Sequence, residues 1–341
     1  MPKIAVLSFW HVHAKDYARE TEAHPETDLV AVWDEDPERG RAEAASRGVR
    51  FVERMDELLA MPEVDGVVVT TATADHTEVI PAAARAGKHV FTEKVIAPTL
   101  QATDQIVSAV DASGVAFVVS LPRLAAGYTR AIDQVLTDGT LGRLTYARVR
   151  VAHEGALRTE KDPDGWLPGR FFDPVAAGGG ALIDLGAHPL YLLRHFLGMP
   201  EGVSAGYGFV TGRAVEDHAV VTLSYADGAL GVAEVGLVGR SPYSIEIHGT
   251  EGSLLYGVPD ARLRVRRDGE DDWTVQTDLP ADGPMPFARW VENITSGTRS
   301  PDNVAIATDL SALAEAANRS AAEGRVVRIS ELARGDQSRS G

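Results

Sequence analysis

The chain has 341 residues, of which 44% are hydrophobic and 24% charged, and its net charge is −16. This length exceeds what one hydrophobic core comfortably fills and predicts two domains of an ordinary globular protein. The negative charge argues against nucleic acid and anionic membranes as partners. Because there is no cysteine, disulfides and thiolate metal sites are excluded. We expect a cytoplasmic protein without a membrane span.

From residue 3 to about residue 120, short apolar runs alternate with amphipathic segments, which is the pattern of a doubly wound parallel sheet. The predicted strands are residues 4–7, 29–33, 49–52, 64–71, 90–92 and 116–121. The predicted helices are residues 13–23, 37–47, 55–60, 77–86 and 102–112, with Asp36 as N-cap and Pro37 as first residue of the second helix. We predict a dinucleotide-binding Rossmann-like domain over residues 1–122.

The pattern changes after Pro122. A predicted helix at 126–137 and a strand at 144–151 lead into a loop-like segment at 153–174 and then a helix that begins after Gly178. Further strands are predicted at 203–210, 218–225, 229–237, 244–248, 252–256, 262–266 and 273–277, with short turns typical of an antiparallel sheet. Helices at 287–296 and 303–323 and an apolar run at 326–329 follow.

These elements predict an α+β substrate and oligomerisation domain over residues 123–330, with a large, mostly antiparallel open sheet. We expect helix 303–323 to pack back on the first domain, and residues 331–341 to form a tail.

Three glycines, Gly178 to Gly180, open the predicted helix on which Asp184 and His188 stand at positions i and i+4. That spacing places both side chains on one face, where a carboxylate can orient an imidazole or share a substrate hydroxyl with it. By spacing alone, such a pair is more often an ion pair on a helix surface than a catalytic dyad.

The first strand-to-helix turn is where a parallel sheet normally holds a dinucleotide pyrophosphate on glycines. Here the turn reads Ser8-Phe9-Trp10-His11-Val12-His13 and contains no glycine. Trp10 would crowd a pyrophosphate, although the amides of a helix N-terminus can hold a phosphate without glycine. His11 and His13 also admit a metal ion, but no matching carboxylate pattern accompanies them, so we expect none.

Two acidic positions also follow predicted strands. Asp34 ends the second strand, where a carboxylate accepts hydrogen bonds from the adenosine ribose and repels a 2′-phosphate, which favours NAD over NADP. Its alternative role is that of a polar residue that starts the next loop. Glu93 and Lys94 end another strand, where a lysine can polarise or protonate an alkoxide; the alternative is a surface ion pair.

Together these features resemble the Gfo/Idh/MocA family of nicotinamide-dependent oxidoreductases, which includes glucose–fructose oxidoreductase and inositol dehydrogenase. The resemblance extends over nearly the whole chain. The matching segments are Gly87-Lys88-His89-Val90 with Glu93-Lys94, residues 178–188 and 64–69, Asp75-His76, Arg123, and residues 139–142 and 320–325.

The resemblance implies a hydride transfer between a sugar, cyclitol or related polyol and NAD, with NADP less favoured. His188 would accept the carbinol proton, Asp184 would orient His188 and the substrate, and Lys94 would bind the reacting oxygen and the nicotinamide ribose. The cofactor-binding residues would be Ser8, Trp10, His13, Asp34, Thr71, His76, Glu93 and Lys94. The substrate contacts would be Arg123, Trp166, Arg170, Asp184 and His188.

The sequence departs from the family pattern in its glycine-free turn, in Val95 instead of proline after Glu93-Lys94, and in Tyr191 instead of aspartate three residues after His188. Two alternatives stay open: a regulatory relative that binds nucleotide or sugar without turnover, and a lyase or hydrolase that oxidises a sugar transiently and recycles NAD. An exposed sheet face in the second domain predicts a homodimer or homotetramer.

Overall fold

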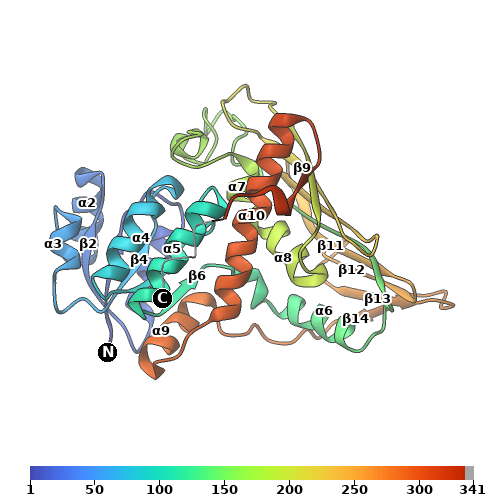
Figure 1. Cartoon of the computed structure of the whole chain (residues 1–341), viewed down its shortest axis with the longest axis horizontal. Coiled ribbons are helices and arrows are strands. Elements are labelled where there is room, and N and C mark those ends of the chain that lie inside the picture. Colours follow the sequence, from blue (N-terminus) through green and yellow to red (C-terminus); the bar gives the residue numbers. More distant parts are fainter. Residues whose placement is uncertain (335–341) are drawn as a thin grey trace. The chain divides into compact units, whose positions relative to one another are not determined.

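The computed structural model describes residues 1–334 of the chain (Figure 1). Its first sheet is parallel and has the strand order β3-β2-β1-β4-β5-β6. The strands are β1 (Lys3–Leu7), β2 (Asp28–Trp33), β3 (Arg50–Phe51), β4 (Gly66–Val69), β5 (His89–Thr92) and β6 (Phe117–Val119). The helices between them are α1 (Ala14–Ala23), α2 (Pro37–Arg47), α3 (Met55–Leu59), α4 (His76–Arg85) and α5 (Leu100–Ser113), with a 3₁₀ turn η1 (Thr73–Asp75). The predicted doubly wound fold is confirmed.

Helix α2 shows how local sequence sets these boundaries. The carboxylate of Asp36 accepts hydrogen bonds from the backbone N–H groups of Glu38 and Arg39, and Pro37 is the first helical residue. The helix ends at Gly48, whose φ of 67° lies in the left-handed region that glycine enters without steric cost. The predicted cap and start of this helix are confirmed.

Helix α9 (Pro286–Ser296) belongs to the core of the first sheet, although it lies far along the chain. The ring centroids of Phe91 on β5 and Trp290 on α9 are 5.9 Å apart, and Phe287 lies 5.7 Å from Trp290. A Cβ atom at Gly66 would stand 2.8 Å from the Trp290 ring, so glycine is required there.

By contacts, one compact unit therefore contains Met1–Ser120 and Pro284–Thr308, and the other contains Leu121–Gly283 and Asp309–Ala333. Residues 284–308, which we predicted within the second domain, are assigned to the first unit. Helix α10 (Pro301–Glu323) begins in the first unit and ends in the second.

The second unit is built on a nine-stranded sheet with the order β14-β13-β12-β11-β7-β10-β9-β8-β15. Its strands are β7 (Leu144–Ala152), β8 (Gly202–Gly208), β9 (His218–Ser224), β10 (Leu230–Gly236), β11 (Ser241–Gly249), β12 (Gly252–Tyr256), β13 (Leu263–Arg267), β14 (Thr274–Gln276) and β15 (Val327–Arg328). Among the described strand pairs of this second sheet, only β7–β10 is parallel, so the predicted, mostly antiparallel sheet is confirmed. Ala147, Val149 and Val151 alternate inward on β7, and helix α8 (Ala187–Leu197) lies against β7 and β10.

The remaining elements of this unit are helix α6 (Gly127–Thr137), helix α7 (Ala181–Asp184) and the 3₁₀ turns η2 (Pro122–Leu124), η3 (Gly169–Phe172) and η4 (Ile329–Glu331). Of the predicted tail, residues 335–341 lie outside the described residues. Within residues 1–334, no helix combines the length and the apolar character needed to cross a bilayer.

One predicted helix is wrong. The sequence pattern placed Asp184 and His188 on a single helix, but α7 ends at Asp184 and α8 begins at Ala187. Gly186 forms the junction, where a Cβ atom would meet the backbone oxygen of Leu182 at 2.7 Å. Leu185 and Gly186 keep backbone angles of the right-handed helical region, but the Gly186 N–H bonds to the carbonyl of Ala181, five residues earlier, at 2.8 Å. The regular helical ladder is therefore interrupted between Asp184 and His188.

Candidate active site

The glycine-free turn after β1 keeps the backbone conformation that glycine usually provides. Ser8 has a φ of 78°, and within residues 1–334 no other residue except glycine has a positive φ. The Ser8 N–H donates to the carbonyl of Trp33 at 2.7 Å, and the Thr70 hydroxyl donates to the Ser8 carbonyl at 2.6 Å. The Ser8 hydroxyl in turn accepts from the N–H of Trp10 at 2.9 Å, and Trp10 itself is buried. Hydrogen bonds from two neighbouring strands therefore define this turn.

Asp34 stabilises the same turn through hydrogen bonds. Its carboxylate accepts from the N–H of Phe9 at 2.7 Å and from that of Asp36 at 2.8 Å, and Arg39 donates to both of its oxygens at 2.9 and 2.6 Å. Asp34 is 1% exposed. A carboxylate offers about four acceptor sites, and these four bonds use them. Asp34 therefore supports the turn, and the expectation that it accepts bonds from a ribose stays a prediction.

We expect Asp34→Ala to lower the free energy of unfolding by roughly 3–5 kcal/mol, because it breaks a buried ion pair and leaves the Phe9 amide without its acceptor. Urea unfolding followed by circular dichroism measures this change. The control is Asp28→Ala, which removes an exposed carboxylate at the opposite end of β2. Equal effects of the two substitutions would contradict the supporting role of Asp34.

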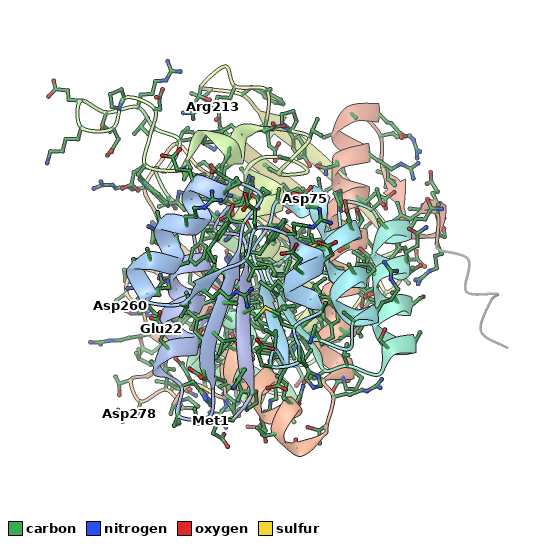
Figure 2. All side chains as sticks on the ribbon, turned by 90° about the vertical axis from the view of Figure 1, so that its left-hand side faces the viewer. Met1, Glu22, Asp75, Arg213, Asp260 and Asp278 are labelled. Carbon is green, nitrogen blue, oxygen red and sulfur yellow. The ribbon has the colours of Figure 1, made fainter. Side chains whose placement is uncertain are left out.

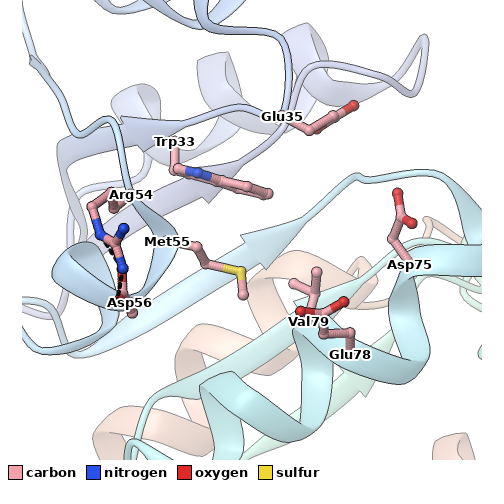
Figure 3. A pocket seen from close by; sticks show the side chains of 8 residues that line it. All are labelled: Trp33, Glu35, Arg54, Met55, Asp56, Asp75, Glu78 and Val79. Atoms are coloured by element: carbon pink, nitrogen blue, oxygen red, sulfur yellow. Dashed lines mark hydrogen bonds and ion pairs between the residues drawn. The ribbon is translucent and has the colours of Figure 1, made fainter.

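A pocket of about 480 Å³ opens beyond the ends of β2, β3 and β4 (Figure 3). Figure 3 shows the side chains of Trp33, Met55 and Val79 around its middle, and Glu35 and Asp75 on facing segments at one end. Asp75 is also labelled in Figure 2. The lining residues are Trp33, Glu35, Arg54, Met55, Asp56, Asp75, Glu78 and Val79.

This pocket is acidic. Four of its lining residues are carboxylic acids and one is arginine, and Arg54 already pairs with Asp56 at 2.6 Å. Glu35 pairs with Arg39 at 2.6 Å while its side chain stays 34% exposed. Burial raises the pKa of Glu35, with Asp34 adding to the effect. A flat apolar middle with acidic ends suits an uncharged nucleoside and disfavours an added phosphate.

Glu93, at the end of β5, is the centre of a buried polar cluster. Its carboxylate lies 2.9 Å from Nδ1 of His13 and 3.5 Å from Nζ of Lys94, and it accepts a hydrogen bond from the Tyr17 hydroxyl. Burial by itself would raise the pKa of Glu93, but Lys94, His11 and His13 outweigh burial and hold that pKa well below its usual range. Glu93 is therefore ionised beside Nζ of Lys94.

Burial shifts the pKa values of two other members of the cluster. Burial lowers the pKa of His11 well below its usual value, and burial beside Glu93 raises the pKa of Tyr17 well above its own. One ligand atom from each of His11, His13 and Glu93 lies within 4.8 Å of the others. The sequence argument against a metal assumed that no carboxylate accompanied the histidines, whereas Glu93 provides one. The expectation of no metal thus loses this support and stays a prediction.

Two of the predicted cofactor-binding residues carry buried polar atoms that lack partners. Among the described residues, Oγ1 of Thr71 and Nε2 of His76 have no hydrogen-bond partner, although both atoms are buried. Both residues follow β4 at the carboxyl edge of the sheet, and Nδ1 of His76 lies 3.1 Å from the carbonyl of Ile96. Buried polar atoms without partners are costly. Unfilled donors and acceptors at this edge fit a dinucleotide, which binds where the strand order reverses.

In the second unit, Gly180 allows a close contact with Glu216. Glu216 accepts from the N–H groups of Gly180 and Leu182, and its carbonyl accepts from Ala181. A Cβ atom at Gly180 would lie 2.5 Å from the carbonyl oxygen of Glu216. Sequence reasoning missed the contact of Gly180 with Glu216, because Glu216 lies 36 residues away.

His188 lies in the first turn of α8 and is 8% exposed. Its Nδ1 is 3.0 Å from the hydroxyl of Tyr191. Asp184 ends α7 and is half-buried. The charge of Asp184 acts to raise the pKa of His153, although burial of His153 outweighs it and lowers that pKa. His153 thus stands near Asp184 at the end of β7, a position that the sequence analysis left as the start of a loop.

The predicted substrate contacts have different surroundings. The guanidinium of Arg123 lies 4.4 Å from the ring centroid of Tyr243, within a cluster of tyrosines. The Trp166 ring is 4.8 Å from that of His153, and Trp166 lines a surface cavity of about 420 Å³. Arg170 lies on η3 and is not among the residues that line this cavity.

The loop at 153–174 is attached to its unit by Arg213, which is labelled in Figure 2. Arg213 donates to the carbonyl of Ala156 at 2.8 Å, and its guanidinium lies 3.8 Å from the ring centroid of Phe172. These contacts hold in place a segment for which the sequence indicated only turns.

Comparison with known proteins agrees with this architecture. Residues 9–121 match the oxidoreductase family with an NAD-binding Rossmann fold, and residues 129–255 match the GFO/IDH/MocA C-terminal domain. A 1,5-anhydro-D-fructose reductase from Ensifer adhaerens is 32% identical over 67% of this chain and 68% of its own length. A scyllo-inositol 2-dehydrogenase (NAD(+)) from Bacillus subtilis is 28% identical over 72% of this chain and 70% of its own.

The fold is also that of a levoglucosan dehydrogenase solved with NADH and L-sorbose. The two structures share a TM-score of 0.82 at 19% identity, over 96% of this chain and 99% of the other. The two matched domains and the similarity to the Ensifer reductase establish the relationship. The chain belongs to the Gfo/Idh/MocA family of NAD-binding oxidoreductases.

Proposed function

We propose that this chain transfers hydride between a secondary alcohol carbon of a sugar, cyclitol or related polyol and NAD. The observation that carries this proposal is the carboxyl edge of the parallel sheet, where buried Lys94 stands beside ionised Glu93 and where Thr71 and His76 have unfilled polar atoms. The related reductase and inositol dehydrogenase support the substrate class.

We propose separate roles for the three reactive residues. Lys94 donates a hydrogen bond to the reacting oxygen, which stabilises negative charge as the O–H proton leaves. His188 accepts that proton, and Asp184 orients the substrate hydroxyl groups. When bound, the nicotinamide ring takes up the hydride. In the reductive direction the same groups act in reverse, and His188 returns the proton.

We propose that the pocket of Figure 3 receives the adenosine part of NAD. Its acidic ends suit a ribose with two hydroxyl groups, since carboxylates accept from hydroxyls and repel a 2′-phosphate. Because the four acceptor sites of Asp34 are used within the protein, Glu35 takes the role that we had assigned to Asp34.

The test begins with calorimetric titration of NAD⁺ and NADP⁺ into the purified protein. Absorbance of reduced nicotinamide is then followed with scyllo-inositol and NAD⁺, and with 1,5-anhydro-D-fructose and NADH. We expect saturable NAD binding and turnover of at least one alcohol–carbonyl pair in a wider polyol panel. Absence of binding to either nucleotide would overturn the proposal, whereas binding without any turnover would favour a regulatory relative.

We also propose that the protein is a cytoplasmic homodimer or homotetramer. The nine-stranded sheet exposes apolar side chains, with Val220 49% and Leu230 43% exposed, and the chain contains no cysteine for disulfides. Light scattering after gel filtration measures the mass, and a monomer at micromolar concentration would contradict this assembly.

A further inference from the structure

His153 lies at the carboxyl end of the parallel strand pair β7–β10. Its N–H donates to the carbonyl of Gly236, the last residue of β10, at 3.0 Å. Ala147, Val149 and Val151 of β7 are buried on the face that α8 covers. Because side chains alternate along a strand, the side chain of His153 projects on this same face. The imidazole therefore stands at the end of the strand, on the side of the sheet that carries α8.

Helix α7, which ends at Asp184, is attached to the same edge of the sheet. Strand β9 is antiparallel to β10, so it begins where β10 ends. Two residues before β9, the carbonyl of Glu216 accepts from the N–H of Ala181, the first residue of α7, at 3.0 Å. Burial lowers the pKa of His153, and the charge of Asp184 opposes this effect, as expected for two neighbouring groups. His153 and Asp184 thus lie together at the end of the parallel pair.

The hydrogen bond that holds the imidazole of His153 also defines its tautomer. The backbone N–H of Gly155 donates to Nδ1 of His153 at 3.0 Å, so Nδ1 is an acceptor and the proton of the neutral ring is on Nε2. A backbone N–H can only donate, so this assignment does not depend on the rotation of a hydroxyl. Because burial lowers the pKa of His153, the neutral ring predominates at pH 7 and above.

The ring of Trp166 packs against the same imidazole. The two ring centroids are 4.8 Å apart, and the ring planes meet at 44°. A Cβ atom at Gly155 would lie 2.7 Å from Cε1 of His153 and 3.1 Å from the Trp166 ring, so a side chain there would displace the imidazole. Gly155 and Trp166 together therefore hold the ring so that its Nε2–H is available as a donor on the edge opposite Nδ1.

We propose that His153 is a substrate-binding residue that donates its Nε2–H to the polyol hydroxyl next to the one that is oxidised. This inference rests on the proposed function, in which Asp184 orients the substrate hydroxyl groups. A hydroxyl accepts and donates at once, so the hydroxyl that accepts from His153 can donate its own proton to the carboxylate of Asp184. The donor and the acceptor together select a free hydroxyl at this position against an ether or a hydrogen atom.

Two substitutions of His153 test this role by steady-state kinetics. His153→Phe keeps an aromatic ring but removes the donor, whereas His153→Gln places an amide N–H near the position of Nε2. With a polyol that is turned over, we expect His153→Phe to raise KM about tenfold and to leave kcat within about twofold, as for an interaction made equally in the ground and transition states. His153→Gln should keep KM within about threefold of that of the unsubstituted protein. An unchanged KM in His153→Phe, or no rescue by His153→Gln, would overturn the proposal.

His218→Phe is the matched control. His218 pairs with Gly236 of β10, but it lines a cavity with Arg150 and Ala152, on the face of the sheet away from α8. The same loss of an imidazole at this position should leave KM and kcat unchanged. Calorimetric titration of NAD⁺ should give the same Kd for all three variants and the unsubstituted protein. An equal rise of KM in His218→Phe would overturn the assignment to His153.

Failure of the proposed function is distinguishable from failure of this inference by ¹⁵N NMR with labelled histidine, which needs neither NAD⁺ nor turnover. We expect a protonated Nε2 and an unprotonated Nδ1 for His153, whose signals are assigned by their loss in His153→Gln. The Nε2–H signal should shift when scyllo-inositol, myo-inositol or 1,5-anhydro-D-fructose is added. This shift in a protein without turnover would overturn the proposed hydride transfer alone. An unprotonated Nε2, or a signal that none of the three compounds shifts, would overturn the role of His153.

Discussion

Replacement of Lys94 by methionine is expected to lower kcat for polyol oxidation by about 10²–10⁴-fold, the range typical of lost proton-transfer and charge-stabilising groups. Methionine retains most of the side-chain length but has no charge and no donor. The Lys94 side chain is buried beside ionised Glu93, so no water replaces the ammonium readily. Steady-state kinetics and NAD titration together show whether the loss lies in turnover or in binding.

Lys15→Met is the control for this substitution, since the Lys15 side chain is 65% exposed and pairs with Glu43 on the surface. His188→Asn should lower kcat by a similar factor, and because both groups act in one step, the double variant should lose less than the product of the two. If NAD binds and turnover survives both single substitutions, the proposed catalytic set is wrong.

Replacement of Glu35 by arginine should shift the ratio of kcat/KM values for NAD⁺ and NADP⁺ by about 100-fold toward NADP⁺. The substitution removes a carboxylate from the rim of the adenosine pocket and adds a cation that can pair with the 2′-phosphate. Such a charged hydrogen bond contributes roughly 1.5–3 kcal/mol, and tenfold in affinity corresponds to about 1.4 kcal/mol. Glu35→Gln should give an intermediate ratio, because it removes only the repulsion.

The control for Glu35 is Glu26→Arg, which makes the same change of charge at an exposed position before β2, away from the pocket. This control should leave the cofactor ratio unchanged. If Asp34→Asn shifts the preference and Glu35→Arg does not, the ribose is bound by Asp34 and our reassignment fails.

Much of the fold could be predicted because local patterns decide it. The cap at Asp36, the apolar strands at 64–71 and 90–92 and the short turns of the second sheet are local signals, and each is found in the structure. The assignment of α9 to the first sheet could not be predicted. It depends on Trp290 filling the space over Gly66, a contact between residues more than two hundred positions apart.

The sequence predicted which residues form the candidate site better than it predicted which partners those residues contact. Glu93 and Lys94 do meet at a strand end. The role of Asp34, however, depends on Arg39 and on the amide of Phe9, and the partner found for His188 depends on where α8 begins. Spacing cannot show that Gly186 interrupts the helix, because glycine is tolerated within helices as well as between them.

The turn after β1 has a consequence for how relatives of this chain are recognised. Its shape is maintained by the carboxylate of Asp34 and by Arg39 five residues later, with Ser8 in the left-handed conformation. A search that requires glycines after the first strand would discard such chains as unable to bind nucleotides. A search for an acidic residue after the second strand, followed at the fifth position by arginine, would retain this chain.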